Sequence, residues 1–363
     1  MSSEQQGQKI ITGSKNRIFL YDNIKFIAII LVVIGHAIDF LARADGNYLE
    51  KDLFLTIYSV HMPLFIFVSG LFLKPMDKSS RFPIQKVLSY VLIGMAIRMF
   101  SAILRLILGM KPNYSVLDMY DTYAWFMWAM AVFVAMMWLC RTFDTRFVLA
   151  GSVAVALMAG YDKFLGDELA LMRIVVFLPF FIVGYMMTPE KLANLLSKKW
   201  LKIISVFVII VILAIFFLDQ RFYTYLRPMF TGRNSYSSLH DFYRFGFIFR
   251  IAGYLISSVF GIAIMCLVPN KNLGYLSVMG TKTLQIYFWH KLFLITMERF
   301  GVYSFIASFT GDTLATLIYI FIAVGIAFLC SLNVFQFPTK QLLSIGKSKA
   351  QCTCSQIEST EHI

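Results

Sequence analysis

Long apolar segments separated by short polar stretches dominate the chain. A transmembrane helix needs roughly 17–25 mostly apolar residues, and ten segments reach or approach that length. They cover approximately residues 24–43, 53–73, 87–109, 122–140, 147–161, 170–188, 202–218, 246–268, 280–297 and 313–333. The pattern predicts an all-α, polytopic membrane protein with about ten transmembrane helices.

The composition supports this class. Hydrophobic residues make up 59% of the 363 positions and charged residues only 15%, against about 45–50% and about 25% in soluble domains. So large an apolar excess does not fit inside one globular core, because a folded surface needs polar cover. A soluble enzyme, a disordered chain and a disulfide-stapled secreted protein are therefore excluded.

The positive charges predict how the chain crosses the bilayer. With the N-terminus inside, 18 of the 33 Lys and Arg residues fall in cytoplasmic segments and nine on the opposite face. Positive residues favour the cytoplasmic side, so both termini are expected to be cytoplasmic. The net charge of +13 is then mainly an orientation signal. We expect the lipid bilayer as a partner and no nucleic acid.

The same reading divides the chain into three parts. Residues 1–17 are expected to form a cytoplasmic tail without a cleavable signal peptide, residues 18–335 the transmembrane domain, and residues 336–363 a cytoplasmic tail. The longest outer loop covers about 219–245. All five cysteines are predicted on the reducing side, so no disulfide is expected. A lone Cys352-x-Cys354 pair is weak grounds for a metal, and no metal site is expected.

Ionisable residues inside predicted spans are costly and are functional candidates by default. These are Lys25, His36, His61, Arg98, Arg105, Arg173, Arg250, His290 and Lys291. The three histidines fall at similar depth near the midplane, as expected if they line one cavity. Lys25 and His36 are almost three helical turns apart and share a face with Asp22 and Asp39. That face is predicted to look into a polar cleft from the cytoplasmic boundary to mid-membrane.

Simpler explanations stay open for several of these residues. Lys25 and Arg105 have side chains long enough to reach the headgroups. His290 has the alternative of a hydrogen-bonded packing histidine, and His61, just before Met62-Pro63, that of a helix-kink residue. His36 is the strongest candidate, because its whole stripe is polar.

Five motifs in order along the chain resemble the acyltransferase 3 family of bacterial integral-membrane O-acyltransferases. They are Tyr21-Asp22-Asn23-Ile24-Lys25 with Lys25-x10-His36, His61-Met62-Pro63-Leu64-Phe65-Ile66-Phe67-Val68-Ser69-Gly70, Trp125-Phe126-Met127, Pro179-Phe180-Phe181-Ile182-Val183-Gly184-Tyr185 and Ile286-Tyr287-Phe288-Trp289-His290. The branch that resembles fucose 4-O-acetylases and modifies surface polysaccharides is the most similar. The chain departs from the family near residues 86–90, where Ser89 stands in place of a frequent proline.

The resemblance implies transfer of an acetyl group from cytoplasmic acetyl-CoA to a sugar hydroxyl of a capsule, O-antigen or exopolysaccharide, in a bacterial cytoplasmic (inner) membrane. Acetyl-CoA is then a co-substrate, and no permanently bound cofactor is expected. His36 is the expected general base or acyl carrier, with Asp39 orienting its ring. Lys25 or Arg98 would bind CoA phosphates or the oxyanion. His61, His290 and Trp125 would complete the substrate site.

The outer loop departs from the positive-inside trend, because it carries Arg221, Arg227, Arg233 and Arg244 among many aromatic residues. Arginine and tyrosine suit an anionic or lipid-pyrophosphate-linked glycan, and Arg233 and Arg244 are the candidate contacts. Aromatic residues resting at headgroup level are the alternative. Two other functions also stay open: a polysaccharide or lipid transporter, and transfer of succinyl or another acyl group.

Overall fold

The computed structural model describes residues 17–345 except 45, 47, 113–122, 166–168 and 220, and within them it contains helices and no strand. The α-helices are α1 (Phe19–Ile38), α2 (Tyr48–Tyr58), α3 (His61–Leu71), α4 (Ile84–Ile107), α5 (Trp125–Leu139), α6 (Thr145–Ala159), α7 (Leu171–Tyr185), α8 (Pro189–Leu196), α9 (Lys199–Leu218), α10 (Arg221–Thr231), α11 (Gly246–Leu267), α12 (Tyr275–Thr281), α13 (Thr283–Arg299), α14 (Val302–Thr310), α15 (Asp312–Cys330) and α16 (Thr339–Ser344). Short 3-10 helices are η1 (Leu41–Arg43), η2 (Tyr236–Phe245) and η3 (Asn333–Gln336). The all-α prediction is confirmed.

Fewer helices than the ten predicted spans are long enough to count as candidate membrane crossings. Within the described residues, six helical segments are long and apolar enough to span a bilayer, or eight if the bent pairs α7–α8 and α13–α14 each count as one. The predicted fourth and fifth spans correspond to α5 and α6, which have only 15 residues each. At about 1.5 Å per residue such a helix is shorter than the roughly 30 Å hydrocarbon core. The count of ten is therefore not confirmed.

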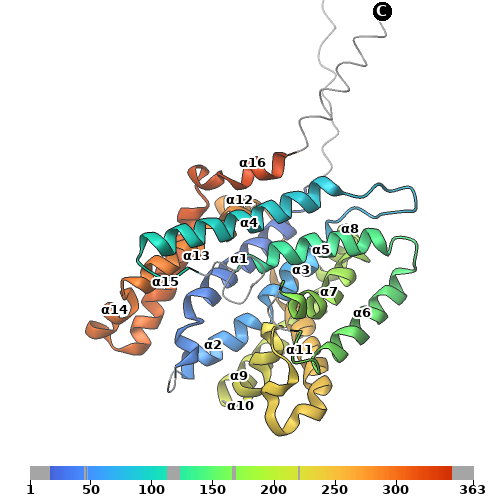
Figure 1. The fold of residues 1–363 in the computed structure, drawn as a ribbon. Coiled ribbons are helices and arrows are strands. Elements are labelled where there is room, and N and C mark those ends of the chain that lie inside the picture. The colour runs from blue at the N-terminus through green and yellow to red at the C-terminus, as the bar shows by residue number, and fades with distance from the viewer. Residues whose placement is uncertain are drawn as a thin grey trace, which may run out of the picture.

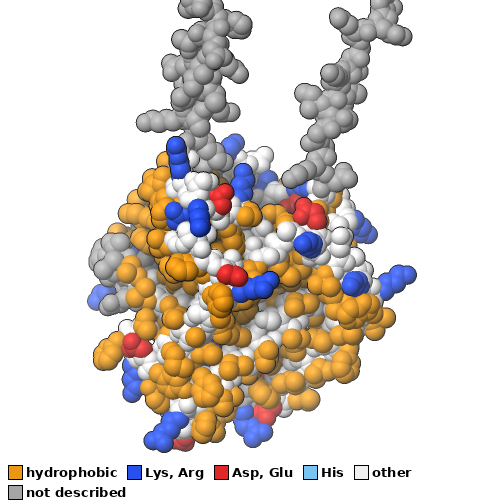
Figure 2. Space-filling view, turned by 90° about the vertical axis from the view of Figure 1, so that its right-hand side faces the viewer, with side chains coloured by type: hydrophobic (Ala, Val, Ile, Leu, Met, Phe, Trp, Pro, Cys, Tyr) orange, Lys and Arg blue, Asp and Glu red, His pale blue; other side chains and the backbone are white. Residues whose placement is uncertain are grey.

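The exterior carries the apolar side chains that a multi-pass membrane protein presents to lipid. In α9, Ile203, Phe207 and Ile210 are all exposed, which in water would be an aggregation hazard. Figure 2 shows hydrophobic side chains spread broadly over the middle of one face, with Lys, Arg, Asp and Glu gathered toward its upper and lower parts. Apolar helices and the charged ends together fit a bilayer.

Helix α1 lies inside the bundle and packs against α2, α3, α12, α13 and α15. In Figure 1 it runs between α14 and α15 on one flank and α6 on the other. We call the end with α8, α12 and α16 the α12 end, and the opposite end, with α10, the α10 end. Asn23 anchors α1 at the α12 end, donating to the carbonyls of Pro269 (2.8 Å) and Lys271 (2.9 Å).

Two motif glycines explain how α3 and α7 approach each other. A Cβ at Gly70 would collide with the carbonyl oxygen of Phe181, and a Cβ at Gly184 with that of Phe67. The contact is reciprocal, so each glycine lets the backbone of the other helix come close, as small residues do between membrane helices. This packing fixes α3, which begins at His61, relative to α7.

The predicted cytoplasmic tail begins with ordered structure. Trp289 donates to the carbonyls of Phe335 (3.1 Å) and Phe337 (3.0 Å), and α16 packs against α4 and α13. Residues 336–345 therefore belong to the folded domain. Residues 1–16 and 346–363, which include Cys352 and Cys354, lie outside the described residues.

Candidate active site

A cavity of about 320 Å³ contains most of the polar residues singled out in the sequence. We call it the histidine cavity. It lies toward the α10 end and is lined by His36, Asp39, Phe40, Arg43, Tyr58, His61, Met62, Arg105, Tyr123, Trp125, Arg173, Phe230, Thr231, Arg233, Lys291, Ile295 and Glu298. The residues come from at least seven helices, so the site exists only in the assembled bundle.

The three histidines gather at this cavity, as their depth predicted. His36 and His61 line it, and the His290 ring lies 5.3 Å from the His36 ring, centroid to centroid. His290 is completely buried. The Tyr58 ring packs edge-on against His61 at 4.7 Å. His36 therefore has the cavity on one side and a second imidazole on another.

Backbone contacts fix the tautomers of the two flanking histidines. Nδ1 of His61 lies 2.7 Å from the carbonyl oxygen of Ile57, and Nδ1 of His290 lies 3.0 Å from that of Ile286. A carbonyl only accepts, so Nδ1 carries the proton and Nε2 of the neutral ring is an acceptor. Nε2 of His290 is buried without a hydrogen-bond partner among the described residues, which leaves it available to a donor at His36.

Asp39 lies in the cavity but is engaged elsewhere. Its carboxylate forms an ion pair with Arg43, one turn further along the chain. The ring of His36 has no hydrogen bond to Asp39 among the contacts of the described residues, so a role for Asp39 in orienting that ring stays a prediction. The imidazole of His290 and the ring of Tyr123 pack against His36 at 5.3 Å and 6.4 Å, centroid to centroid.

Cations outnumber carboxylates in the histidine cavity. Five Arg or Lys residues face two acidic residues among its lining side chains: Arg43, Arg105, Arg173, Arg233 and Lys291 against Asp39 and Glu298. The Lys291 ammonium lies 3.4 Å from the backbone oxygen of His36, and Arg173 lies 5.0 Å above the Trp125 ring. Such a cavity favours an anionic ligand.

A second cavity, of about 340 Å³, lies toward the α12 end; we call it the lysine cavity. Its lining contains Lys25 and Lys86, and is otherwise mostly apolar, including Phe65, Met127 and Tyr287. The Lys25 ammonium lies 2.9 Å from Asp22 and 5.9 Å from the centre of the Phe72 ring. Asp22 also binds Arg17 at 2.6 Å.

The polar face predicted on α1 therefore opens into two cavities instead of one continuous cleft. Lys25 faces the lysine cavity, whereas His36 and Asp39 face the histidine cavity. Between them, Met62 of α3 lines both cavities, and Tyr123 packs against Tyr287 of α13.

The loop arginines separate into different environments. Arg233 lines the histidine cavity, whereas Arg244 is exposed outside its lining. Arg221 pairs with Asp219 at 2.7 Å, and the hydrogen bonds that its guanidinium donates to the Asp219 carboxylate lower the pKa of that carboxyl. Arg227 packs over the rings of Phe54 and Tyr223.

Other site residues depart from the prediction. Arg98 belongs to the lining of neither cavity among the described residues. Arg173 and Lys291 stood out in the sequence as charges inside spans, but their place beside Trp125 and His36 had no signal in local spacing. Tyr58 and Tyr123 resemble any interfacial aromatic residue in the sequence, and neither was foreseen as part of the site.

Comparison with known proteins identifies the family of the chain. The family model for the acyltransferase domain matches residues 20–332, which is most of the chain, so the chain belongs to the acyltransferase 3 family. A shorter stretch of 59 residues is 42% identical to nodulation protein NolL of Sinorhizobium fredii, and covers 16% of this chain and 16% of NolL. No solved structure matches. The chain thus carries the acyltransferase domain of this family, and its long apolar helices fit a multi-pass membrane protein.

Proposed function

We propose that the chain transfers an acetyl group from acetyl-CoA to a sugar hydroxyl of a cell-surface glycan, across a bacterial cytoplasmic membrane. The observation that carries the proposal is the placement of His36, which faces a cation-rich cavity and packs against a second imidazole. Family membership supports acyl transfer over the transporter alternative. The position of His36 is a second argument, because a transporter has no need of a titratable group there.

His36 acts as the general base in this proposal. Its imidazole removes the proton from the acceptor hydroxyl as the oxygen attacks the thioester carbonyl carbon. The C–S bond then breaks, and the CoA thiolate takes the proton from His36. A cation such as Lys291 stabilises the oxyanion formed between these steps. In a second route, His36 acts as a nucleophile and forms an acetyl-histidine intermediate with release of CoA, and the acceptor hydroxyl then takes the acetyl group from it.

The two cavities suit the two substrates. The lysine cavity, with Lys25 and Lys86, is assigned to acetyl-CoA, since ammonium groups bind phosphates as point charges. The histidine cavity is assigned to the acceptor. Its excess of cations favours an anionic or lipid-pyrophosphate-linked glycan.

The test compares His36→Ala and His36→Gln with the wild type, using membranes of the source cells as acceptor and acetyl-CoA labelled in the acetyl group. A general base contributes about 10²–10⁴-fold, so label in the glycan should fall at least a hundredfold at equal protein levels. His240→Gln, an exposed histidine outside the cavity lining, is the control. Wild-type transfer by both His36 variants would refute the proposal. Acetyl-protein trapped without acceptor, and absent from both variants, would select the acetyl-histidine route.

A further inference from the structure

The histidine cavity and the lysine cavity meet at one side chain. Among the described residues, Met62 lines both of them. It follows His61, which faces the histidine cavity, and lies about one turn before Phe65, which faces the lysine cavity. Its own exposed fraction is 8%, so it fills the space between the two.

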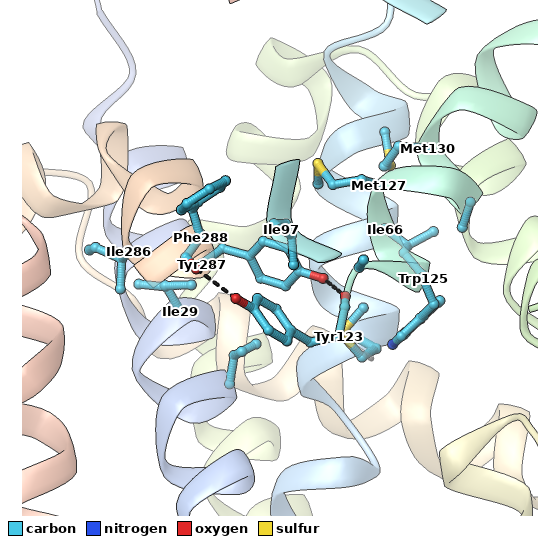
Figure 3. Close-up of a cluster of buried hydrophobic side chains, with 14 of the residues drawn as sticks. Ile29, Ile66, Ile97, Tyr123, Trp125, Met127, Met130, Ile286, Tyr287 and Phe288 are labelled. Carbon is cyan, nitrogen blue, oxygen red and sulfur yellow. Dashed lines mark hydrogen bonds between the residues drawn. The ribbon is translucent and has the colours of Figure 1, made fainter. Parts of the chain in front are cut away.

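Two tyrosines complete the partition beside Met62. Tyr123 lines the histidine cavity, Tyr287 lines the lysine cavity, and their rings pack edge to face at 5.5 Å. The Tyr287 hydroxyl donates to the backbone oxygen of Tyr123, and the Tyr123 hydroxyl donates to that of Phe288 at 2.8 Å. Figure 3 shows both contacts. Hydrogen bonds at both hydroxyls hold this pair in place.

Met62 differs from the tyrosines because its side chain makes no hydrogen bond and has an unbranched, flexible stem. A rotamer change there would join the cavities without breaking polar contacts, whereas movement of either tyrosine would leave a buried hydroxyl unpaired. Met62 is therefore the movable part of the partition, and the tyrosine pair is the fixed part.

The proposed reaction needs such a passage. For transfer, the thioester carbonyl must come within about 3–3.5 Å of the acceptor oxygen, although the two substrates occupy different cavities. We infer that Met62 is the gate through which the acyl group reaches His36, and that its size restricts transfer to short acyl groups such as acetyl. This inference rests on the proposed function.

Purified protein in vesicles, with membranes of the source cells as acceptor, tests the gate with acetyl-, butyryl- and hexanoyl-CoA. Met62→Ala should raise the ratio of butyryl to acetyl transfer about tenfold or more, since each methylene in a restrictive pocket is worth about 1–3 kcal/mol. Met62→Phe should abolish transfer while binding of labelled acetyl-CoA persists. Met62→Leu, similar in volume, should keep the wild-type preference.

Met137→Ala is the matched control. It removes the same atoms from a buried methionine, 3% exposed, that lines neither cavity among the described residues. It should leave the butyryl-to-acetyl ratio unchanged. An unchanged ratio in Met62→Ala, or full transfer by Met62→Phe, would overturn the gate. If Met62→Ala does not fold, Met62→Phe and Met62→Leu still decide. Absence of transfer from every acyl-CoA by the wild type would instead refute the proposed function.

Discussion

His290 lies directly behind His36, and the two rings are 5.3 Å apart. Its Nδ1–H is committed to the carbonyl of Ile286, which leaves the buried Nε2 as an acceptor without a partner among the described residues. We expect this acceptor to orient the His36 ring during the reaction. Among the described residues no hydrogen bond joins a carboxylate to the His36 ring, so we expect His290 to take the positioning role predicted for Asp39.

We therefore expect His290→Ala to lower the rate of acetyl transfer about a hundredfold, near the lower bound for general-base catalysis, with little change in the KM for acetyl-CoA. The measurement is initial rate against acetyl-CoA concentration in membranes. Thr296→Ala is the control, because it also removes a side-chain contact to an i−4 carbonyl of α13. Activity of His290→Ala within twofold of wild type would exclude the positioning role.

Lys25 is predicted to act on the donor. Its ammonium pairs with Asp22, and it faces the lysine cavity. Loss of a hydrogen bond to a charged group costs about 1.5–3 kcal/mol, so Lys25→Gln should raise the KM for acetyl-CoA about tenfold or more. Lys25→Arg should retain most of the affinity.

Lys78→Gln serves as the comparison for Lys25, since Lys78 is an exposed loop residue of the same charge. Equal KM values for Lys25→Gln, Lys78→Gln and wild type would show that Lys25 only reaches toward the headgroups, the alternative that its long side chain permits.

At the scale of helices, the α3–α7 contact positions His61 and Met62. Gly70→Ala and Gly184→Ala each place a methyl group against the carbonyl of the facing helix. Overpacking of this kind costs about 1–3 kcal/mol, so both variants should lower the melting temperature in detergent.

Gly151→Ala gives the matched control in α6, where an added Cβ meets nothing within 4 Å. Because alanine is favoured over glycine in a helix by about 0.5–1 kcal/mol, this variant should be neutral or stabilising. A melting temperature unchanged by Gly70→Ala would mean that α3 and α7 can move apart without loss of stability. That result would contradict close backbone packing between them.

Arg250 of α11 organises the segment that brings Arg233 into the histidine cavity. Arg250 is 1% exposed, and its guanidinium donates to the backbone oxygens of Met229 (2.8 Å) and Asn234 (3.4 Å). Gly232 lies between these two residues in the chain with a positive φ of 66°, and a Cβ there would collide with the Phe177 ring. The arginine therefore clamps both ends of a tight turn.

Arg250→Met should leave those carbonyls without a partner, at about 1–3 kcal/mol each, and should raise the KM for the acceptor more than the KM for acetyl-CoA. The exposed Arg244→Met is the control for charge alone. The two KM values, measured with fixed membrane acceptor and with fixed donor, separate the roles. Equal changes in both would point to general destabilisation instead.

Sequence patterns predicted the positions of the helices better than the contacts between side chains of different helices. Each of the ten apolar segments corresponds to a helix, but α5 and α6, with 15 residues each, are shorter than a helix that crosses the hydrocarbon core. Helical depth placed His36 and His61 at one cavity, whereas His290 packs against His36 without lining that cavity. The pairing of Asp39 with Arg43 and the place of Tyr123 depend on rotamers and on which helices meet, and neither is encoded in local periodicity.

At the scale of the molecule, the two ends of the domain lie on the same side. The lysine cavity is lined by Lys25 near the start of α1 and by Leu343 of α16, so the first and last helices meet at the α12 end. An even number of crossings places both on one side, and six, eight and ten are all even. The topology is therefore consistent whether or not α5 and α6 cross fully.

The charge distribution predicts on which side of the membrane this end lies. The α12 end carries Lys74, Lys78, Lys191 and Lys271, and positive loops remain cytoplasmic. We expect that a membrane-impermeant maleimide on intact spheroplasts labels Ser237→Cys, exposed in η2 at the α10 end, and does not label Lys78→Cys. Wild type measures labelling of the native cysteines, and permeabilised cells should label both variants. The reverse pattern would place His36 in a cavity open to the cytoplasm and would remove the need for transfer across the membrane.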